Sequence, residues 1–112
     1  MILIIGGAAQ GKNEYADRQY GDGYTIIHDF QNVIFEQQKK GEDAMKAAVS
    51  LLEEATDLER LVIVCDEVGY GLVPVDASER RYRETVGRVS CYLAERATCV
   101  VRIVAGIPVR IK

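Results

Sequence analysis

Short runs of aliphatic residues alternate along the chain with longer stretches of mixed polarity. Residues 2–5 and 61–65 are uninterrupted apolar runs, which is typical of strands buried on both faces, and Gly6 and Gly7 stop the first run. Further strands are predicted at residues 24–27, 99–105 and 107–111.

The segments between these strands have helical spacing. Helices are predicted at residues 12–20, 30–40, 42–56 and 77–96. The last is the longest, with Asp76 as its expected N-cap and Glu79 three residues further on, in a capping-box arrangement. Its expected apolar face consists of Tyr82, Val86, Val89 and Leu93.

Alternating strands and helices predict one α/β domain over residues 1–112. Its sheet should be mainly parallel, with helices flanking it on both faces. The last two strands are too close in sequence for a crossover, so we expect a C-terminal antiparallel hairpin. Residues 67–75 are punctuated by Gly and Pro and are expected to form a loop.

Composition narrows the class of protein. With 48% apolar and 28% charged residues, the 112-residue chain is typical of a globular domain. A net charge of −3 argues against nucleic-acid binding, although residues 68–112 are basic and residues 1–67 acidic. The chain has no apolar run long enough to cross a membrane and no signal peptide, so a protein that does not enter membranes is expected. Its three cysteines form no disulfide pattern, which is typical of a cytoplasmic protein.

The segment after the first strand carries the most specific motif. It has the spacing G-x-x-x-x-G-K between a buried strand and a helix, as in a phosphate-binding loop. In such loops backbone N–H groups surround phosphate oxygens, and Lys12 would reach the terminal phosphates. A glycine-rich turn with an incidental lysine is the alternative. The candidate nucleotide-binding residues are Gly6, Gly7, Ala8, Ala9, Gln10, Gly11, Lys12 and Asn13.

Asn13 departs from this motif, because the residue after the lysine is usually a Ser or Thr that ligates Mg²⁺. An amide oxygen can also ligate a cation. A carboxylate at a neighbouring strand end is needed as well. Asp66 and Glu67 are the preferred candidates, and Asp29 is a further one. Asn13 and Asp66 are therefore the candidate Mg²⁺ ligands, and Lys12, Asp66 and Glu67 the candidate catalytic residues.

Two further groups of residues are each open to more than one interpretation. His28 is either a hydrogen-bonded structural residue or a group of the nucleotide site. The arginines of the last helix suit phosphate or carboxylate ligands, and they equally suit an oligomer interface or solvent. These arginines are Arg80, Arg81, Arg83 and Arg88.

Residues 67–74, Glu-Val-Gly-Tyr-Gly-Leu-Val-Pro, resemble the E-V-G-x-G-[IL]-V-P segment of the CobU family. The similarity continues through Arg80, Arg83, Gly87 and Arg88 and into residues 103–112, and the opening strand and loop also look like that family's. The family comprises adenosylcobinamide kinase and adenosylcobinamide-phosphate guanylyltransferase enzymes of cobalamin biosynthesis.

The resemblance implies a P-loop NTPase-like fold of the RecA type, use of GTP or ATP with Mg²⁺, a cobinamide corrinoid as acceptor, and a homo-oligomer, a trimer in the family. Three departures qualify it. The segment bearing the family's guanylylated histidine has no counterpart, Asn13 replaces the loop's Ser or Thr, and Ser90 replaces an Asn. Guanylyl transfer is therefore not expected. An adenosylcobinamide kinase and a non-catalytic nucleotide-binding or accessory protein of the corrinoid pathway both stay open.

Overall fold

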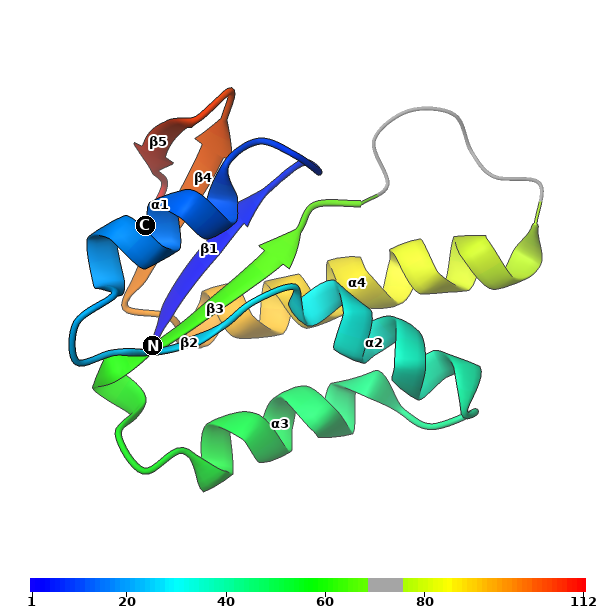
Figure 1. The fold of residues 1–112 in the computed structure, drawn as a ribbon. Coiled ribbons are helices and arrows are strands. Elements are labelled where there is room, and N and C mark those ends of the chain that lie inside the picture. The colour runs from blue at the N-terminus through cyan, green and yellow to red at the C-terminus, as the bar shows by residue number, and fades with distance from the viewer. Residues whose placement is uncertain (69–75) are drawn as a thin grey trace.

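The structure, a computed structural model, describes residues 1–68 and 76–112. Strands and helices alternate over these residues, as the apolar pattern predicts (Figure 1). In chain order the elements are β1 (Ile2–Gly6), α1 (Lys12–Tyr20), β2 (Thr25–Ile27), α2 (Phe30–Lys39), α3 (Ala44–Glu54), the 3₁₀ turn η1 (Leu58–Arg60), β3 (Leu61–Asp66), α4 (Ala77–Arg96), β4 (Cys99–Val104) and β5 (Ile107–Arg110).

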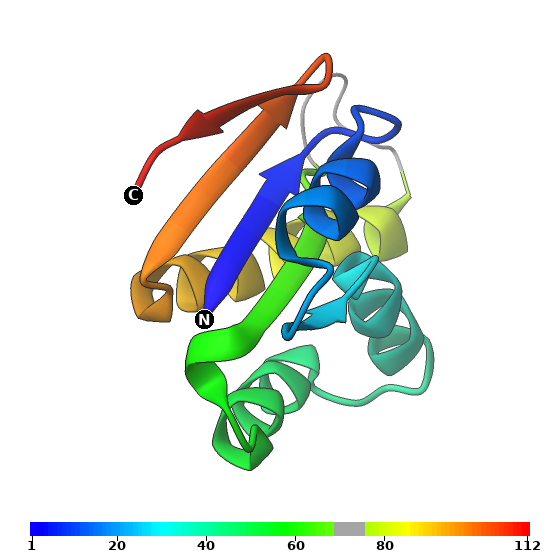
Figure 2. The same cartoon turned by 60° about the vertical axis from the view of Figure 1, so that its left-hand side comes forward.

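The strands form one sheet in the order β2-β3-β1-β4-β5. The pairs β2–β3, β3–β1 and β1–β4 are parallel, and β4–β5 is the antiparallel hairpin at the end of the chain. Figure 2 shows α1 on one face of this sheet and α2, α3 and α4 on the other. The predicted fold class, a mainly parallel sheet flanked by helices with a C-terminal hairpin, is confirmed.

Alternate residues of each central strand enter two separate cores. Leu3 and Ile63 pack on the side of α2, α3 and α4, whereas Ile4 and Val64 pack on the side of α1. Because both faces are covered, residues 2–5 of β1 and residues 61–65 of β3 are apolar at every position. Val86, Val89 and Leu93 of α4 are buried as predicted, and Tyr82 is partly buried beside them.

Most predicted boundaries agree with the structure to within one or two residues. The Asp76 carboxylate accepts a hydrogen bond from the Ser78 N–H, which confirms it as the N-cap of α4. The helix expected at residues 42–56 is shorter, Ala44–Glu54, because Asp43 caps it through the Met45 N–H. Residues 69–75 of the predicted loop lie outside the described residues.

The sheet brings the carboxyl ends of its parallel strands to one edge. Gly6 of β1 is level with Asp66 of β3 and Ile103 of β4. In parallel sheets ligands bind at this edge, so the glycine-rich loop after β1 is correctly placed for such a role. Among the helices of the described segments, none has the length and apolar character of a membrane span.

Candidate functional site

The loop between β1 and α1 has a backbone that requires glycine at two positions. A Cβ on Gly6 would approach the Ile103 carbonyl oxygen to 2.6 Å, so the loop leaves β1 in close contact with β4. Gly11 has φ 89°, in the left-handed region, where it turns the chain into α1. Gln10 holds the loop to the β4–β5 turn, since its side-chain oxygen accepts from the Ala105 N–H at 2.7 Å.

Lys12, the first residue of α1, points back across this loop. Its Nζ lies 2.7 Å from a carboxylate oxygen of Asp66 and donates to the Gly7 carbonyl oxygen at 2.6 Å. Only 6% of the Lys12 side chain is exposed, against 21% for Asp66. The structure thus brings together Lys12 and one of its two preferred carboxylate partners, and the ammonium group bridges the loop and the end of β3.

Gln31 fixes the position of Asp66 and is not among the site residues predicted from the sequence. Its side-chain oxygen accepts from the Asp66 N–H at 2.9 Å, and its Nε2 donates to Asp29 at 3.4 Å. Tyr82 of α4 donates from its hydroxyl to the Gln31 carbonyl oxygen at 3.2 Å. Gln31 is only 8% exposed, and a polar side chain is buried in this way only when it is hydrogen-bonded. Its burial is known only from the fold, and the sequence offers no more than a glutamine in the first turn of the helix predicted at residues 30–40.

A cavity of about 390 Å³ opens over this loop. Acidic, basic and amide groups face it from α1 and from the ends of β2 and β3, which gives it the polar character expected of a phosphate site. Its lining residues are Ala9, Gln10, Gly11, Lys12, Asn13, Glu14, Asp29 and Asp66. Five of the candidate nucleotide-binding residues are therefore in one cavity, and Asp29 joins them.

Asn13 is in contact with His28 rather than with Asp66. Its Oδ1 lies 2.9 Å from Nδ1 of His28, and Nε2 of the same ring lies 2.9 Å from an Asp17 carboxylate oxygen. Asp17 is one turn after Asn13 on α1, so the two side chains share a face of the helix. His28 is thus a hydrogen-bonded residue that touches the candidate nucleotide site, which combines the two readings given above.

Glu67, the other preferred carboxylate, lies apart from Lys12. Its two oxygens are 3.0 and 3.1 Å from Nε of Arg102, and its side chain is 14% exposed. Arg102 belongs to the β4 face that carries Val100, which packs on the α4 side of the sheet. Glu67 is not among the residues that line the cavity, and its predicted catalytic role stays a prediction.

The candidate Mg²⁺ ligands do not fit a metal site in this arrangement. The Asp66 carboxylate is paired with the Lys12 ammonium, and the Asn13 carbonyl oxygen is paired with His28. A divalent cation would have to separate the first pair and break the second, and two cations close together repel each other. Among residues 1–68 and 76–112, no cluster of three or more acidic, His or Cys side chains could hold an ion.

Burial changes the acidity of two groups behind the site. It raises the pKa of the Cys65 thiol to about 12, with Asp66 adding to the effect, so the thiol is neutral at physiological pH. Burial also raises the pKa of the Tyr82 hydroxyl. Both groups are therefore neutral at physiological pH, and the Tyr82 hydroxyl acts as a hydrogen-bond donor.

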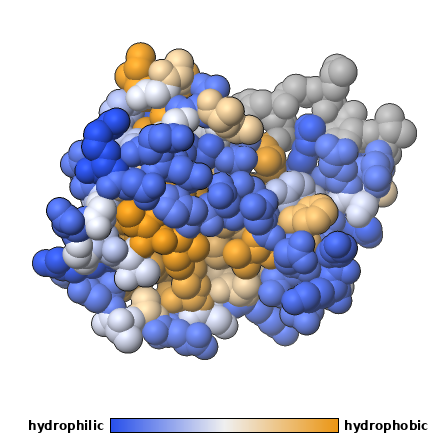
Figure 3. Space-filling view, viewed as in Figure 1, coloured by the Kyte–Doolittle hydropathy of each residue, from blue (hydrophilic) through white to orange (hydrophobic). Residues whose placement is uncertain are grey.

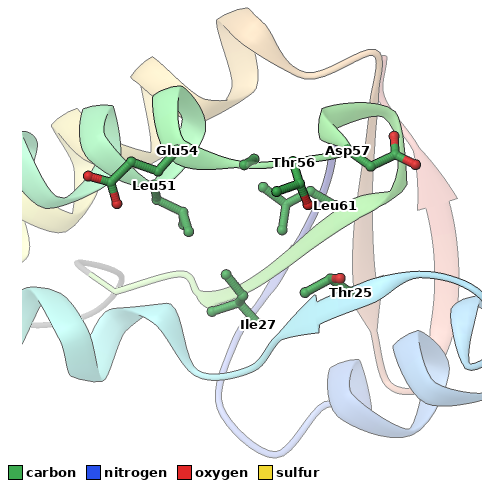
Figure 4. Close-up of a pocket in the computed structure, with 8 residues that line it drawn as sticks. Thr25, Ile27, Leu51, Glu54, Thr56, Asp57 and Leu61 are labelled. Atoms are coloured by element: carbon green, nitrogen blue, oxygen red, sulfur yellow. The ribbon is translucent and has the colours of Figure 1, made fainter.

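A second hollow, of about 330 Å³, lies at the opposite end of β3 (Figure 4). Ile27, Leu51 and Leu61 face one another across it, while Thr25, Glu54 and Asp57 surround them at its rim. In the space-filling view, taken from the same side as Figure 1, apolar surface gathers in the middle of the face and polar surface surrounds it (Figure 3). This hollow contains none of the motif residues and lies away from the edge at which parallel sheets bind ligands.

Two of the four candidate arginines contact acidic residues of α4 itself. Arg83 lies 3.6 Å from Glu79, and Arg88 is paired with Glu84, each one turn away. None of the four lines the cavity over the loop. The choice among a ligand, an interface and solvent therefore stays open for them.

Most of the chain matches the sequence model of one protein family. Residues 24–111 match CobU, described as cobinamide kinase / cobinamide phosphate guanyltransferase. The glycine-rich loop precedes the matched residues, so its interpretation depends on the motif and the geometry above.

Individual relatives match over a shorter stretch. The bifunctional adenosylcobalamin biosynthesis proteins CobU of Escherichia coli (strain K12) and Salmonella typhimurium are each 43% identical over 53 residues, which is 47% of this chain and 29% of either relative. The bifunctional adenosylcobalamin biosynthesis protein CobP of Pseudomonas aeruginosa is 38% identical over 53 residues, 31% of its length. The aligned stretch thus spans less than a third of these relatives.

Proposed function

Because the chain belongs to the CobU family of cobinamide kinases and cobinamide phosphate guanyltransferases, we propose that it binds the phosphates of a purine nucleoside triphosphate, GTP or ATP, in the corrinoid pathway. The observation that carries this proposal is the Lys12 ammonium, which is buried between the glycine-rich loop and Asp66 in a polar cavity. A bound polyphosphate replaces Asp66 as the partner of Lys12, so the ammonium exchanges one anion for another.

In this proposal, both backbone amides and one side chain of the candidate binding residues contact the phosphates. The amides of the Gly7–Gly11 segment donate to the β-phosphate, the positive end of the α1 dipole favours the anion, and Lys12 contacts the terminal phosphates. The resemblance also implies Mg²⁺ in relatives, but the oxygens that would hold it here are paired with Lys12 and His28, so no step of this proposal uses a metal ion.

A kinase activity is the second candidate, and the placement of two carboxylates favours it. Asp29 and Asp66 line the same cavity as Lys12. In this reaction the aminopropanol hydroxyl of a cobinamide attacks the γ-phosphorus, the bond to the β–γ bridging oxygen breaks, and the nucleoside diphosphate leaves. One carboxylate takes the hydroxyl proton while Lys12 neutralises charge on the leaving phosphate.

Calorimetric titration with GTP and with ATP tests the binding proposal. We expect one saturable site in wild type and at least tenfold weaker binding in Lys12→Met, because the variant keeps the volume of the side chain and loses its charge. Arg60→Met is the matched control, since Arg60 is a solvent-exposed cation outside the cavity. No binding by wild type, or equal binding by Lys12→Met, would overturn the proposal.

Two assays separate the remaining alternatives. Release of nucleoside diphosphate with phosphorylated cobinamide supports the kinase, while nucleotide binding without turnover supports an accessory protein. Light scattering of the purified protein tests the homo-oligomer, a trimer by resemblance, that the proposal includes.

A further inference from the structure

Asp29 occupies the N-cap position of α2, but its side chain does not cap the helix. An Asp at this position usually accepts a hydrogen bond from one of the first N–H groups of the helix. Here the side chain makes no such bond, and the backbone lies in the left-handed region at φ 54° and ψ 48°. Asp and Asn adopt this conformation more readily than other side-chain-bearing residues. The carboxylate is therefore directed to something other than its own helix.

The Asp29 carboxylate lines the cavity over the glycine-rich loop together with Lys12 and Asp66. Its one hydrogen-bond partner among residues 1–68 and 76–112 is the Gln31 side-chain amide, whose Nε2 donates to it at 3.4 Å. This contact is long for a hydrogen bond, and within the same ranges no cation is paired with the carboxylate. Asp29 thus presents an acceptor to the cavity that its neighbours leave largely unused.

The other two candidate carboxylates are already engaged. An Asp66 oxygen lies 2.7 Å from Nζ of Lys12, in the place that the proposed function gives to a phosphate. A bound phosphate would repel Asp66 from that place, because both are anions. Glu67 is paired with Arg102 and does not line the cavity. Asp29 does not compete for Lys12, so it is the carboxylate that keeps its position when a nucleotide binds.

We propose that Asp29 is the catalytic base, the carboxylate that binds the acceptor hydroxyl and takes its proton during phosphoryl transfer. The proposal rests on the kinase activity proposed above and assigns one residue to its proton transfer. The hydroxyl proton passes to an Asp29 oxygen while the acceptor oxygen bonds to the γ-phosphorus. The bond from this phosphorus to the β–γ bridging oxygen breaks, and its electron pair leaves with the nucleoside diphosphate.

Turnover of adenosylcobinamide with GTP or ATP, whichever binds more tightly, tests the assignment in Asp29→Asn. This variant keeps the size of the side chain and its tolerance of the left-handed backbone, and it loses the charge. We expect kcat to fall by at least about a hundredfold. The dissociation constant for the nucleotide, measured by calorimetry, should stay within about threefold of wild type. Asp22→Asn, an exposed carboxylate outside the cavity, is the matched control and should keep the wild-type kcat.

A second variant separates the carboxylate from the backbone turn. Asp29→Gly adopts the left-handed conformation without strain, so it should fold at least as stably as wild type and lose turnover as Asp29→Asn does. Added formate supplies a small carboxylate for the vacated space. It should restore at least part of the turnover of Asp29→Gly, but not that of Asp29→Asn, whose amide fills the space.

The outcomes separate this inference from the proposed function. Absence of nucleotide binding by wild type would overturn both, and binding without phosphorylated cobinamide would overturn the kinase and this inference alone. Turnover of both Asp29 variants within threefold of wild type would overturn only the assignment of the base. A loss of turnover that formate does not reverse in Asp29→Gly, or nucleotide binding weakened tenfold in both variants, would also overturn it.

Discussion

The pairing of Lys12 with Asp66 predicts a large energetic coupling between two residues 54 positions apart in the chain. Lys12→Met leaves the partly buried Asp66 carboxylate without its cation, and Asp66→Asn leaves a lysine that is 6% exposed with the Gly7 carbonyl oxygen as a partner. Loss of one partner of a buried pair costs about 3–5 kcal/mol, and the 21% exposure of Asp66 favours the lower end.

We therefore expect each single variant to lose about 3 kcal/mol of the free energy of unfolding. The double variant removes both charges and should lose about the same amount rather than the sum. The coupling energy is then about 2–3 kcal/mol, well above what independent sites show. Urea denaturation followed by circular dichroism measures all four free energies, with the slope checked for two-state behaviour.

A matched pair on the surface provides the control. Arg60 and Asp57 approach to 3.8 Å with side chains 60% and 57% exposed, so Arg60→Met and Asp57→Asn should couple by less than about 0.5 kcal/mol. If the Lys12 and Asp66 variants were also additive within that margin, the ammonium would not be held by this carboxylate. That result would contradict the proposal that a bound phosphate replaces Asp66 as the partner of Lys12.

Three further predictions concern the groups around the loop. Gly6→Ala should destabilise the protein by about 1–3 kcal/mol, because the new Cβ would meet the Ile103 carbonyl oxygen. Gly87→Ala places its Cβ in open space on α4 and should stabilise the protein by roughly 0.5–1 kcal/mol. Thermal denaturation compares the two variants. Burial raises the pKa of the Cys65 thiol to about 12 in the folded state only. Between about pH 9 and pH 12 the free energy of unfolding should therefore fall by up to about 1.4 kcal/mol per pH unit, as measured by urea denaturation at several pH values. Cys65→Ala should flatten this decline. Gln31→Leu should leave the Asp66 N–H without a partner and lose about 1–3 kcal/mol, measurable by urea denaturation; an unchanged midpoint would contradict its assigned role.

Much of the fold could be predicted because each central strand is buried on both faces. A continuous apolar run such as residues 61–65 has no polar side, so its apolar length alone marks it as a buried strand. The β4–β5 hairpin was predictable because the strands expected at residues 99–105 and 107–111 are too close for a crossover, and the structure places its turn at Ala105 and Gly106.

The candidate site was less predictable because it depends on which side of the sheet each strand end faces. Asp66 and Glu67 are adjacent in sequence, but one pairs with Lys12 of α1 and the other with Arg102 of β4. A period of two places neighbouring residues on opposite faces without saying which face carries the loop. The contact of Asn13 with His28 depends on how α1 packs beside β2, and only the four-residue spacing of Asn13 and Asp17 hinted at a shared face.

The backbone amides of the glycine-rich loop offer the most direct test of the account. In ¹⁵N-labelled protein titrated with GTP, we predict saturable chemical-shift changes largest at the amides of Gly7–Asn13, with little change at Thr56 and Asp57 beside the opposite hollow. If the chemical shifts of the loop amides did not change at saturating GTP, or if the changes were centred on Thr56 and Asp57, the claim that this loop binds a polyphosphate would be contradicted.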